Sequence, residues 1–111
     1  MTRHVEVRVT ADTREEAERI VNAAVAGRVA AGAQISGPIA STYWWKGEIQ
    51  RNDEYVILMK STTDRLDDLI VVVKEAHSYE TPEIVAAPIE GGLADYLDWI
   101  TEETTGSPKA E

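Results

Sequence analysis

Cysteine is absent from this chain of 111 residues. The absence excludes disulfides, zinc knuckles, iron–sulfur clusters and a thiol nucleophile, because each of these needs a cysteine sulfur. Imidazole is nearly as scarce, since His4 and His77 are the only histidines. Metal binding or acid–base chemistry would therefore have to use these two side chains or the carboxylates.

Basic residues and long apolar runs are also few. The 11 Lys and Arg stand against 20 Asp and Glu, which gives a formal net charge of −9. Nucleic-acid binders need a basic stripe, so we expect no nucleic-acid partner. No apolar run approaches the ~20 residues that cross a bilayer, and the N-terminal MTRHVEVRVT is too polar for a signal peptide. We therefore expect no membrane partner and a cytoplasmic location.

The N-terminal third has the signals of a strand followed by a helix. Valines alternate with polar residues over residues 5–9, as in a strand with one buried face. Thr13 and Glu16 have the T-x-x-E spacing of a capping box, which begins a helix. Apolar residues then recur at helical spacing as far as Val25, and Gly27 indicates the end of the helix.

The middle of the chain predicts a long hairpin. Residues 33–45 and 48–61 form two extended segments joined by a tight turn at Lys46-Gly47. Ser36-Gly37-Pro38 breaks the first segment and indicates a bulge or bend, and Asn52-Asp53 is expected to interrupt the second. The hairpin is longer than a domain of this size needs, so we expect part of it to project and pair elsewhere.

The C-terminal half predicts a helix over 66–76, a strand over 83–89, a helix over 93–100 and a flexible polar tail over 104–111. The order β-α-β-β-α-β plus a terminal helix is that of a ferredoxin-like α+β sandwich. We expect one domain over residues 1–103. Two helices cover only one face of such a sheet, so the other face must be solvated or covered by a partner.

The segment from His77 to Glu83 is the richest in chemistry. It places the imidazole of His77, the phenol of Tyr79 and the carboxylates of Glu80 and Glu83 directly after a helix. Such a set can bind a divalent cation, and His77, Glu80 and Glu83 are the metal ligands that we predict. A purely structural interpretation competes with this one, because the helix dipole favours a histidine at a helix C-terminus and Pro82 ends the helix.

Aromatic residues cluster on the predicted hairpin. Tyr43, Trp44 and Trp45 are consecutive on a strand, so their side chains alternate between its two faces. They can form a subunit interface or a wall that stacks against a ligand. The interface is favoured, because aromatic residues are enriched at subunit contacts and exposed tryptophans on a monomer would be an uncovered apolar patch.

Charged residues of the hairpin are the remaining candidates. Glu54 can join a carboxylate site, and Lys60 can pair with a carboxylate of the 77–83 segment or bind an anionic ligand. Together with Tyr79 they are the ligand-binding residues that we predict, although such charges more often form a solvated face. No serine lies in a Gly-x-Ser-x-Gly sequence, so a serine hydrolase is not expected.

Five blocks of sequence occur in an order that is similar to a known family. They are RVAAGAQ at 28–34, YWWKGEI at 43–49, KST at 60–62, HSYETPEI at 77–84 and DYLDW at 95–99. Together they resemble the CutA divalent-ion tolerance family, and the resemblance extends from about residue 5 to residue 103. The second and fourth blocks in combination are specific, whereas either one alone would not be.

The resemblance implies a homotrimer similar in architecture to PII signalling proteins, in which strands of neighbouring subunits complete extended sheets. It also implies a role in tolerance of divalent metal ions, with Cu²⁺ the ion most expected. One position departs from the family, because Gly32 stands where a cysteine is usual. Copper cannot be held through that thiol, so a metal site would have to use His77 and carboxylates.

Three functions follow, in decreasing order of expectation. The first is a homotrimeric protein that binds a divalent cation, or another ligand, in response to metal ions. The second is a PII-like sensor of a small molecule, with clefts between subunits near Lys60, Tyr79 and Glu80. The third is an enzyme with His77 as acid or base, which we do not expect because no nucleophile, oxyanion donors or cofactor motif accompany it.

Overall fold

The computed structural model describes residues 3–105 and has the α+β order that the sequence predicts. Its elements are β1 (His4–Ala11), α1 (Arg14–Ala26), β2 (Gly32–Trp45), β3 (Glu48–Thr62), the single-turn η1 (Thr63–Arg65), α2 (Leu66–Ala76), β4 (Ile84–Pro88) and α3 (Ala94–Glu103). This is the predicted ferredoxin-like succession with a further helix at the C-terminal end.

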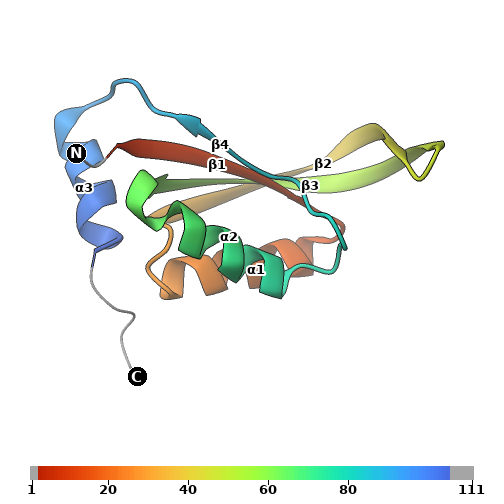
Figure 1. The fold of residues 1–111 in the computed structure, drawn as a ribbon, viewed down its shortest axis with the longest axis horizontal. Coiled ribbons are helices and arrows are strands. Elements are labelled where there is room, and N and C mark those ends of the chain that lie inside the picture. Colours follow the sequence, from red (N-terminus) through yellow and green to blue (C-terminus); the bar gives the residue numbers. More distant parts are fainter. Residues whose placement is uncertain (1–2, 106–111) are drawn as a thin grey trace.

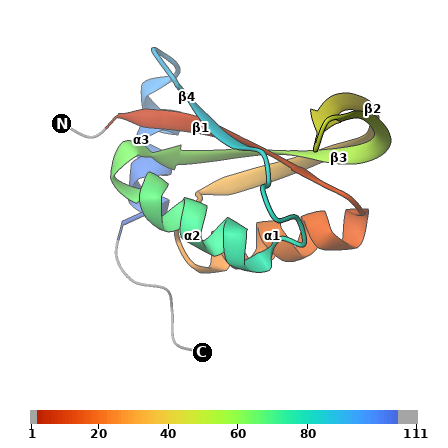
Figure 2. The ribbon, with the colours of Figure 1, turned by 45° about the vertical axis from the view of Figure 1, so that its right-hand side comes forward.

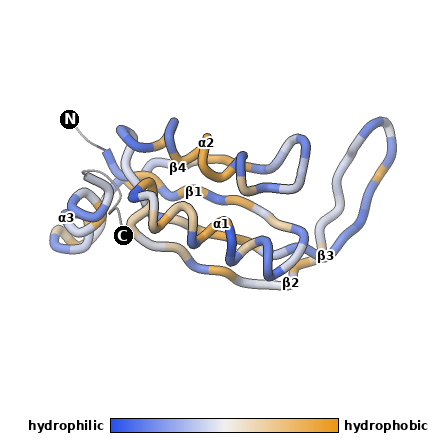
Figure 3. The backbone as a smooth tube through the Cα atoms, turned by 90° about the horizontal axis from the view of Figure 1, so that it is seen from below, coloured by the Kyte–Doolittle hydropathy of each residue, from blue (hydrophilic) through white to orange (hydrophobic). Residues whose placement is uncertain are grey.

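The four strands form one antiparallel sheet in the order β2-β3-β1-β4. Helices α1 and α2 lie side by side on one face of this sheet, and no helix lies along the other face within the described residues (Figures 1 and 2). The alternating valines of β1 point toward the helices. They pack with buried residues of α1, β3 and α2, among them Ile20, Met59 and Leu69. Figure 3 shows these apolar stretches gathered where the strands and helices pack together.

Only half of the predicted capping box forms at the start of α1. The Thr13 hydroxyl accepts a hydrogen bond from the Glu16 backbone N–H at 3.1 Å, as expected for an N-cap. The Glu16 side chain does not return this bond to Thr13. It is buried and accepts hydrogen bonds from Ser78 in the loop after α2. A residue predicted to cap a helix therefore also fixes a distant loop.

The β2–β3 hairpin runs on well past the rest of the sheet (Figure 1). The register of β2 shifts between Ser36 and Ile39, which confirms the predicted bulge. The expected interruption at Asn52-Asp53 is wrong, because both residues keep their partners in β2. At the tip, Lys46 and Gly47 both have positive φ, 51° and 82°, as a tight two-residue hairpin turn requires.

Helix α3 lies at the end of the molecule opposite the hairpin tip (Figure 1). Trp99 of this helix packs over Gly32, where an added Cβ would come within 3.2 Å of the Trp99 Cη2 atom. Gly32 therefore leaves room for the indole ring of Trp99. Thr104 follows the helix and is buried, with its hydroxyl donating to the Ile100 carbonyl at 2.8 Å. Residues 106–111 of the predicted tail lie outside the described residues.

Candidate functional site

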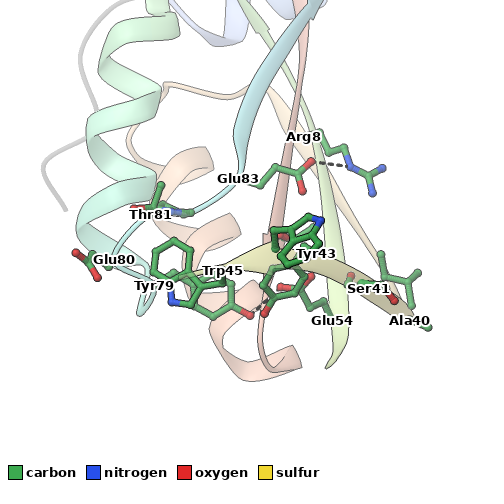
Figure 4. Close-up of a pocket in the computed structure, with 15 residues that line it drawn as sticks. Arg8, Ala40, Ser41, Tyr43, Trp45, Glu54, Tyr79, Glu80, Thr81 and Glu83 are labelled. Atoms are coloured by element: carbon green, nitrogen blue, oxygen red, sulfur yellow. Dashed lines mark hydrogen bonds and ion pairs between the residues drawn. The ribbon is translucent and has the colours of Figure 1, made fainter. Parts of the chain in front are cut away.

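A pocket of about 840 Å³ lies where the hairpin leaves the sheet. It is bounded by β1, by the outer part of β2, by one residue of β3 and by the loop that follows α2 (Figure 4). Because the valines of β1 face the helices, the alternating Arg8 and Thr10 face this pocket. The lining residues are Arg8, Thr10, Ile39, Ala40, Ser41, Thr42, Tyr43, Trp44, Trp45, Glu54, Tyr79, Glu80, Thr81, Pro82 and Glu83.

A buried acid and a phenol form the polar centre of the pocket. Glu54 is only 5% exposed, and the Tyr79 hydroxyl donates a hydrogen bond to its Oε2 atom at 2.8 Å. Burial, and then the hydrogen bond to Glu54, raise the pKa of the Tyr79 phenol far above its ordinary range. The phenol therefore stays protonated and keeps donating to Glu54. Within residues 3–105, no Lys, Arg or His nitrogen lies within 4.0 Å of the Glu54 carboxylate.

Two ion pairs lie at the rim of the pocket. The Arg8 Nε atom is 3.1 Å from Glu83 Oε2, and the Lys46 Nζ atom is 3.9 Å from Glu80 Oε1. All four side chains are substantially exposed, so each pair contributes little to stability. Lys46 also lies 5.5 Å from the centroid of the Trp45 ring. These pairs place a basic group beside Glu80 and beside Glu83. Glu54 has no such basic partner among residues 3–105.

His77 does not face the pocket, because its side chain is fully buried behind the loop. Its Nε2 atom is 2.6 Å from the Thr10 carbonyl oxygen, which can only accept, so the ring proton is on Nε2. The Nδ1 atom accepts the Tyr79 backbone N–H at 3.1 Å and also lies 3.2 Å from the Glu16 Oε2 atom. Both ring nitrogens are thus engaged, and neither is free to take a metal ion or a substrate proton.

Glu16 completes a closed network around this histidine. Its Oε2 atom accepts the Ser78 backbone N–H at 2.6 Å, and its Oε1 atom accepts the Ser78 hydroxyl at 2.9 Å. We call Thr10, Glu16, His77 and Ser78 the closed network. It joins β1 and α1 to the first residues of the loop that carries Tyr79, Glu80 and Glu83. Sequence reasoning missed Glu16 here, since its only signal was the capping-box spacing.

The predicted metal ligands are not gathered around one point in this chain. His77 is engaged inside the closed network, and Glu80 and Glu83 lie apart at the pocket with separate basic partners (Figure 4). Among residues 3–105, no group of three or more His, Cys, Asp or Glu side chains is placed to hold a metal ion.

The predicted ligand-binding residues are divided between two places. Glu54 and Tyr79 meet in the pocket, whereas Lys60 pairs with Glu6 at 3.0 Å. Lys60 is on the same face of β3 as Glu54 but lies six residues farther along it, ~20 Å at ~3.3 Å per residue. It does not line the pocket.

The predicted aromatic interface residues line the outer wall of the pocket. In the single chain Tyr43, Trp44 and Trp45 are 38%, 71% and 39% exposed. The Tyr43 hydroxyl accepts a hydrogen bond from the Asn52 side chain at 2.6 Å, which braces it across the hairpin. This much uncovered aromatic surface fits both alternatives drawn from the sequence, a subunit contact and a stacking wall.

The model of the CutA1 divalent ion tolerance protein family matches residues 5–103. The chain belongs to this family. It is 40% identical over 99 residues to the divalent-cation tolerance protein CutA of Archaeoglobus fulgidus, which covers 89% of this chain and 96% of that one. The solved structure of the Thermus thermophilus protein superposes with a TM-score of 0.90 at 39% identity, covering 92% of this chain and 99% of that one.

Relatives differ in length and in the location that their names give. The chloroplastic CutA 1 of rice is 36% identical over 101 residues, and this chain spans 57% of its length. The solved Archaeoglobus protein is described as periplasmic. A cytoplasmic location for the present chain stays a prediction. No helix within residues 3–105 is both long and apolar enough to cross a membrane.

Proposed function

We propose that this chain is a homotrimeric binding protein of the CutA family that takes a small ligand in the pocket between the hairpin and the 79–83 loop. The observation that carries the proposal is the Glu54–Tyr79 pair, a buried acid that opens onto a pocket and has no basic partner among the described residues. Such a volume is within the range of small-molecule sites, ~300–1,000 Å³. A catalytic role is less well supported, because both nitrogens of His77 are engaged.

The ligand site is tested by a thermal-shift screen of metabolites and metal ions on the purified protein. A ligand that binds only the folded state raises the melting temperature by mass action. The shift produced by any hit should fall strongly in Glu54→Gln and Tyr79→Phe, which alter the pocket with little change in volume. It should persist in Lys60→Gln, which alters a charge outside the pocket. A shift that survives both pocket variants would reject this site.

The homotrimer is supported by the uncovered surface of the hairpin. Its outer part carries Tyr43, Trp44, Trp45 and Ile49, all partly or largely exposed in the single chain. Mass photometry should give three times the 12.2 kDa chain mass. Trp45→Ala should weaken assembly by about 3–5 kcal/mol if the indole is packed at the interface. Val71→Ala removes an exposed apolar side chain from α2 and should leave the mass unchanged.

A second candidate is direct binding of a divalent cation of the copper type. It is favoured by relatives named for divalent-cation tolerance. Glu54, Glu80 and Glu83 line one pocket, and an ion there would have to draw their separate carboxylates together. Without cysteine, Cu²⁺ should bind better than Cu⁺. Calorimetric titration with Cu²⁺ should show the loss of binding in Glu54→Gln/Glu83→Gln, with Glu15→Gln/Glu18→Gln on α1 as the matched control. Equal binding by the two double variants would reject the pocket as the metal site.

A further inference from the structure

We propose that His77 and Glu16 form a proton-operated switch that ties and releases the backbone of the 77–83 loop at Tyr79. When the Nδ1 atom of His77 gains a proton, an ion pair with Glu16 replaces the hydrogen bond from the Tyr79 backbone N–H. The side chains of His77 and Glu16 are 0% and 6% exposed in the single chain. The switch therefore depends neither on a ligand in the pocket nor on the surface that a trimer would cover.

Two groups compete for the Nδ1 atom of His77. The Tyr79 backbone N–H donates to it at 3.1 Å, and the Glu16 Oε2 atom lies 3.2 Å from it. A ring nitrogen accepts a hydrogen bond when it is bare and donates one when it is protonated. The bare nitrogen satisfies Tyr79 and faces a carboxylate oxygen with no proton between them. The protonated nitrogen can bond Glu16 only by giving up the Tyr79 N–H.

The other ring nitrogen holds the ring in the same place in both states. The Nε2 atom is 2.6 Å from the Thr10 carbonyl oxygen, so it carries a proton whether or not Nδ1 does. A proton on Nδ1 therefore meets Glu16 without a rotation of the ring. The two states differ by one proton and by the direction of one hydrogen bond.

Glu16 is held in position to pair with a protonated His77. Its Oε2 and Oε1 atoms accept the backbone N–H and the hydroxyl of Ser78, at 2.6 Å and 2.9 Å. These bonds fix the carboxylate beside the ring before any proton arrives. A charge-assisted bond in a buried place is stronger than the neutral bond that it replaces. The protonated state therefore has a compensating partner inside the fold.

The other ionisable groups near the switch keep one protonation state while it operates. They are Arg19 of α1, Asp12 before α1, Tyr79 in the loop and Glu54 of β3. Arg19 donates to the Ala76 carbonyl at 3.1 Å and is charged throughout. Burial, then Glu54 and then Asp12 raise the pKa of the Tyr79 phenol, which stays protonated. Imidazole is the side chain that ordinarily changes its charge between about pH 5 and 8.

Tyr79 is the residue that the switch releases. Its backbone N–H donates to His77, its ring centroid lies 4.8 Å from that of the His77 ring, and its hydroxyl donates to Glu54. A proton on Nδ1 removes the first contact and leaves a part-buried N–H facing another donor. The backbone at Tyr79 must then move until this N–H finds water or another acceptor.

The test is ¹⁵N NMR of the full, assembled protein titrated between about pH 8 and 5. The chain has two histidines, and His4→Gln assigns the ring signals of His77. We expect the Nδ1 signal of His77 to change from that of a bare nitrogen to that of a protonated one, while Nε2 stays protonated. The backbone amide signal of Tyr79 should move over the same pH interval with the same midpoint.

Two glutamate variants of α1 test the ion pair. Glu16→Gln removes the charge and keeps an acceptor for Ser78, so the His77 midpoint should fall by about one pH unit or more. Glu15→Gln removes the same charge from an exposed position on the same helix and should leave the midpoint nearly unchanged. Equal displacement by both variants would overturn the role of Glu16.

The wild-type titration decides the proposal even if Glu16→Gln does not fold. An Nδ1 signal that stays constant while the protein remains folded would overturn the switch. A titration of Nδ1 that the Tyr79 amide does not follow would also overturn it, because proton uptake would then leave the loop in place. Either failure leaves the proposed ligand site standing, since that site is tested by ligand-induced thermal shifts.

Discussion

The closed network and the pocket lie on either side of one loop. They differ in how completely their polar side-chain atoms are hydrogen-bonded within the chain. In the closed network, every hydrogen-bonding atom of the Glu16 and His77 side chains has a partner in the chain. In the pocket, the Oε2 atom of Glu54 accepts a hydrogen bond from Tyr79, and its Oε1 atom accepts none from the described residues. A fully satisfied buried network fixes a structure, whereas a partly satisfied one leaves capacity for a ligand. This difference supports a positioning role for His77 and is the basis of the ligand-binding role proposed for Glu54.

The largest effect is expected where the closed network is broken. Glu16→Ala removes both acceptors of Ser78 and leaves its part-buried backbone N–H without a partner in the chain. We expect it to lower the free energy of unfolding by about 2–3 kcal/mol. Urea unfolding at a fixed protein concentration measures this loss.

Glu15→Ala is the matched control, because Glu15 is exposed on the same turn of α1. It should change stability by no more than ~0.5 kcal/mol. Similar losses in the two variants would mean that the closed network does not hold the loop. A normal stability in Glu54→Gln beside a weakened Glu16→Ala would sharpen the division between the two regions.

The pH dependence of stability probes the pocket side. Burial and Glu54 raise the pKa of Tyr79 in the folded chain, while the unfolded chain has a tyrosine pKa of about 10. Above about pH 10 the unfolded chain therefore releases a proton that the folded chain retains, and stability falls as the pH rises. The stabilisation that comes from the raised pKa of Tyr79 is fully present below about pH 10.

Tyr79→Phe removes this titration and should flatten the loss of stability between about pH 10 and 11 relative to wild type. Melting temperatures measured across that range give the comparison, and Tyr96→Phe on α3 is the control for general tyrosine ionisation. Parallel curves for wild type and Tyr79→Phe would contradict a protonated, Glu54-bound phenol.

The smallest effect is expected far from both regions, at the C-terminal end. Thr104 is buried and bonded to the Ile100 carbonyl, so it belongs to the folded domain, in contrast to the tail predicted from residue 104. Truncation after Thr105 should leave the melting temperature nearly unchanged. Truncation after Glu103 removes the Thr104 hydrogen bond and should lower it measurably. A large fall in melting temperature on truncation after Thr105 would mean that residues beyond Thr105 make stabilising contacts.

Most of the fold could be predicted because its signals are local. Alternating valines, a threonine cap, a glycine after α1 and the Lys46-Gly47 turn each specify an element from a few neighbouring residues. Asn52-Asp53 misled because turn-forming residues are tolerated in an exposed hairpin that keeps its ladder.

The site could be predicted only in part, because its contacts are not local. The carboxylates and the phenol were found from their chemistry. Which of them meet depends on where the hairpin bends and on bonds between α1 and the loop 62 residues away. Glu54 and Lys60 share a face of β3, and only the bend and the loop distinguish the pocket residue from the one outside it.

The assignment of His77 to positioning is tested most directly by NMR of its ring nitrogens. We predict long-range ¹H–¹⁵N correlations that place a proton on Nε2, because that nitrogen donates to the Thr10 carbonyl. Addition of Zn²⁺, a diamagnetic divalent ion, should leave the His77 signals unchanged. Displacement of the Nδ1 or Nε2 signal of His77 on stoichiometric addition of Zn²⁺ would contradict the account, because the histidine would then be a metal ligand.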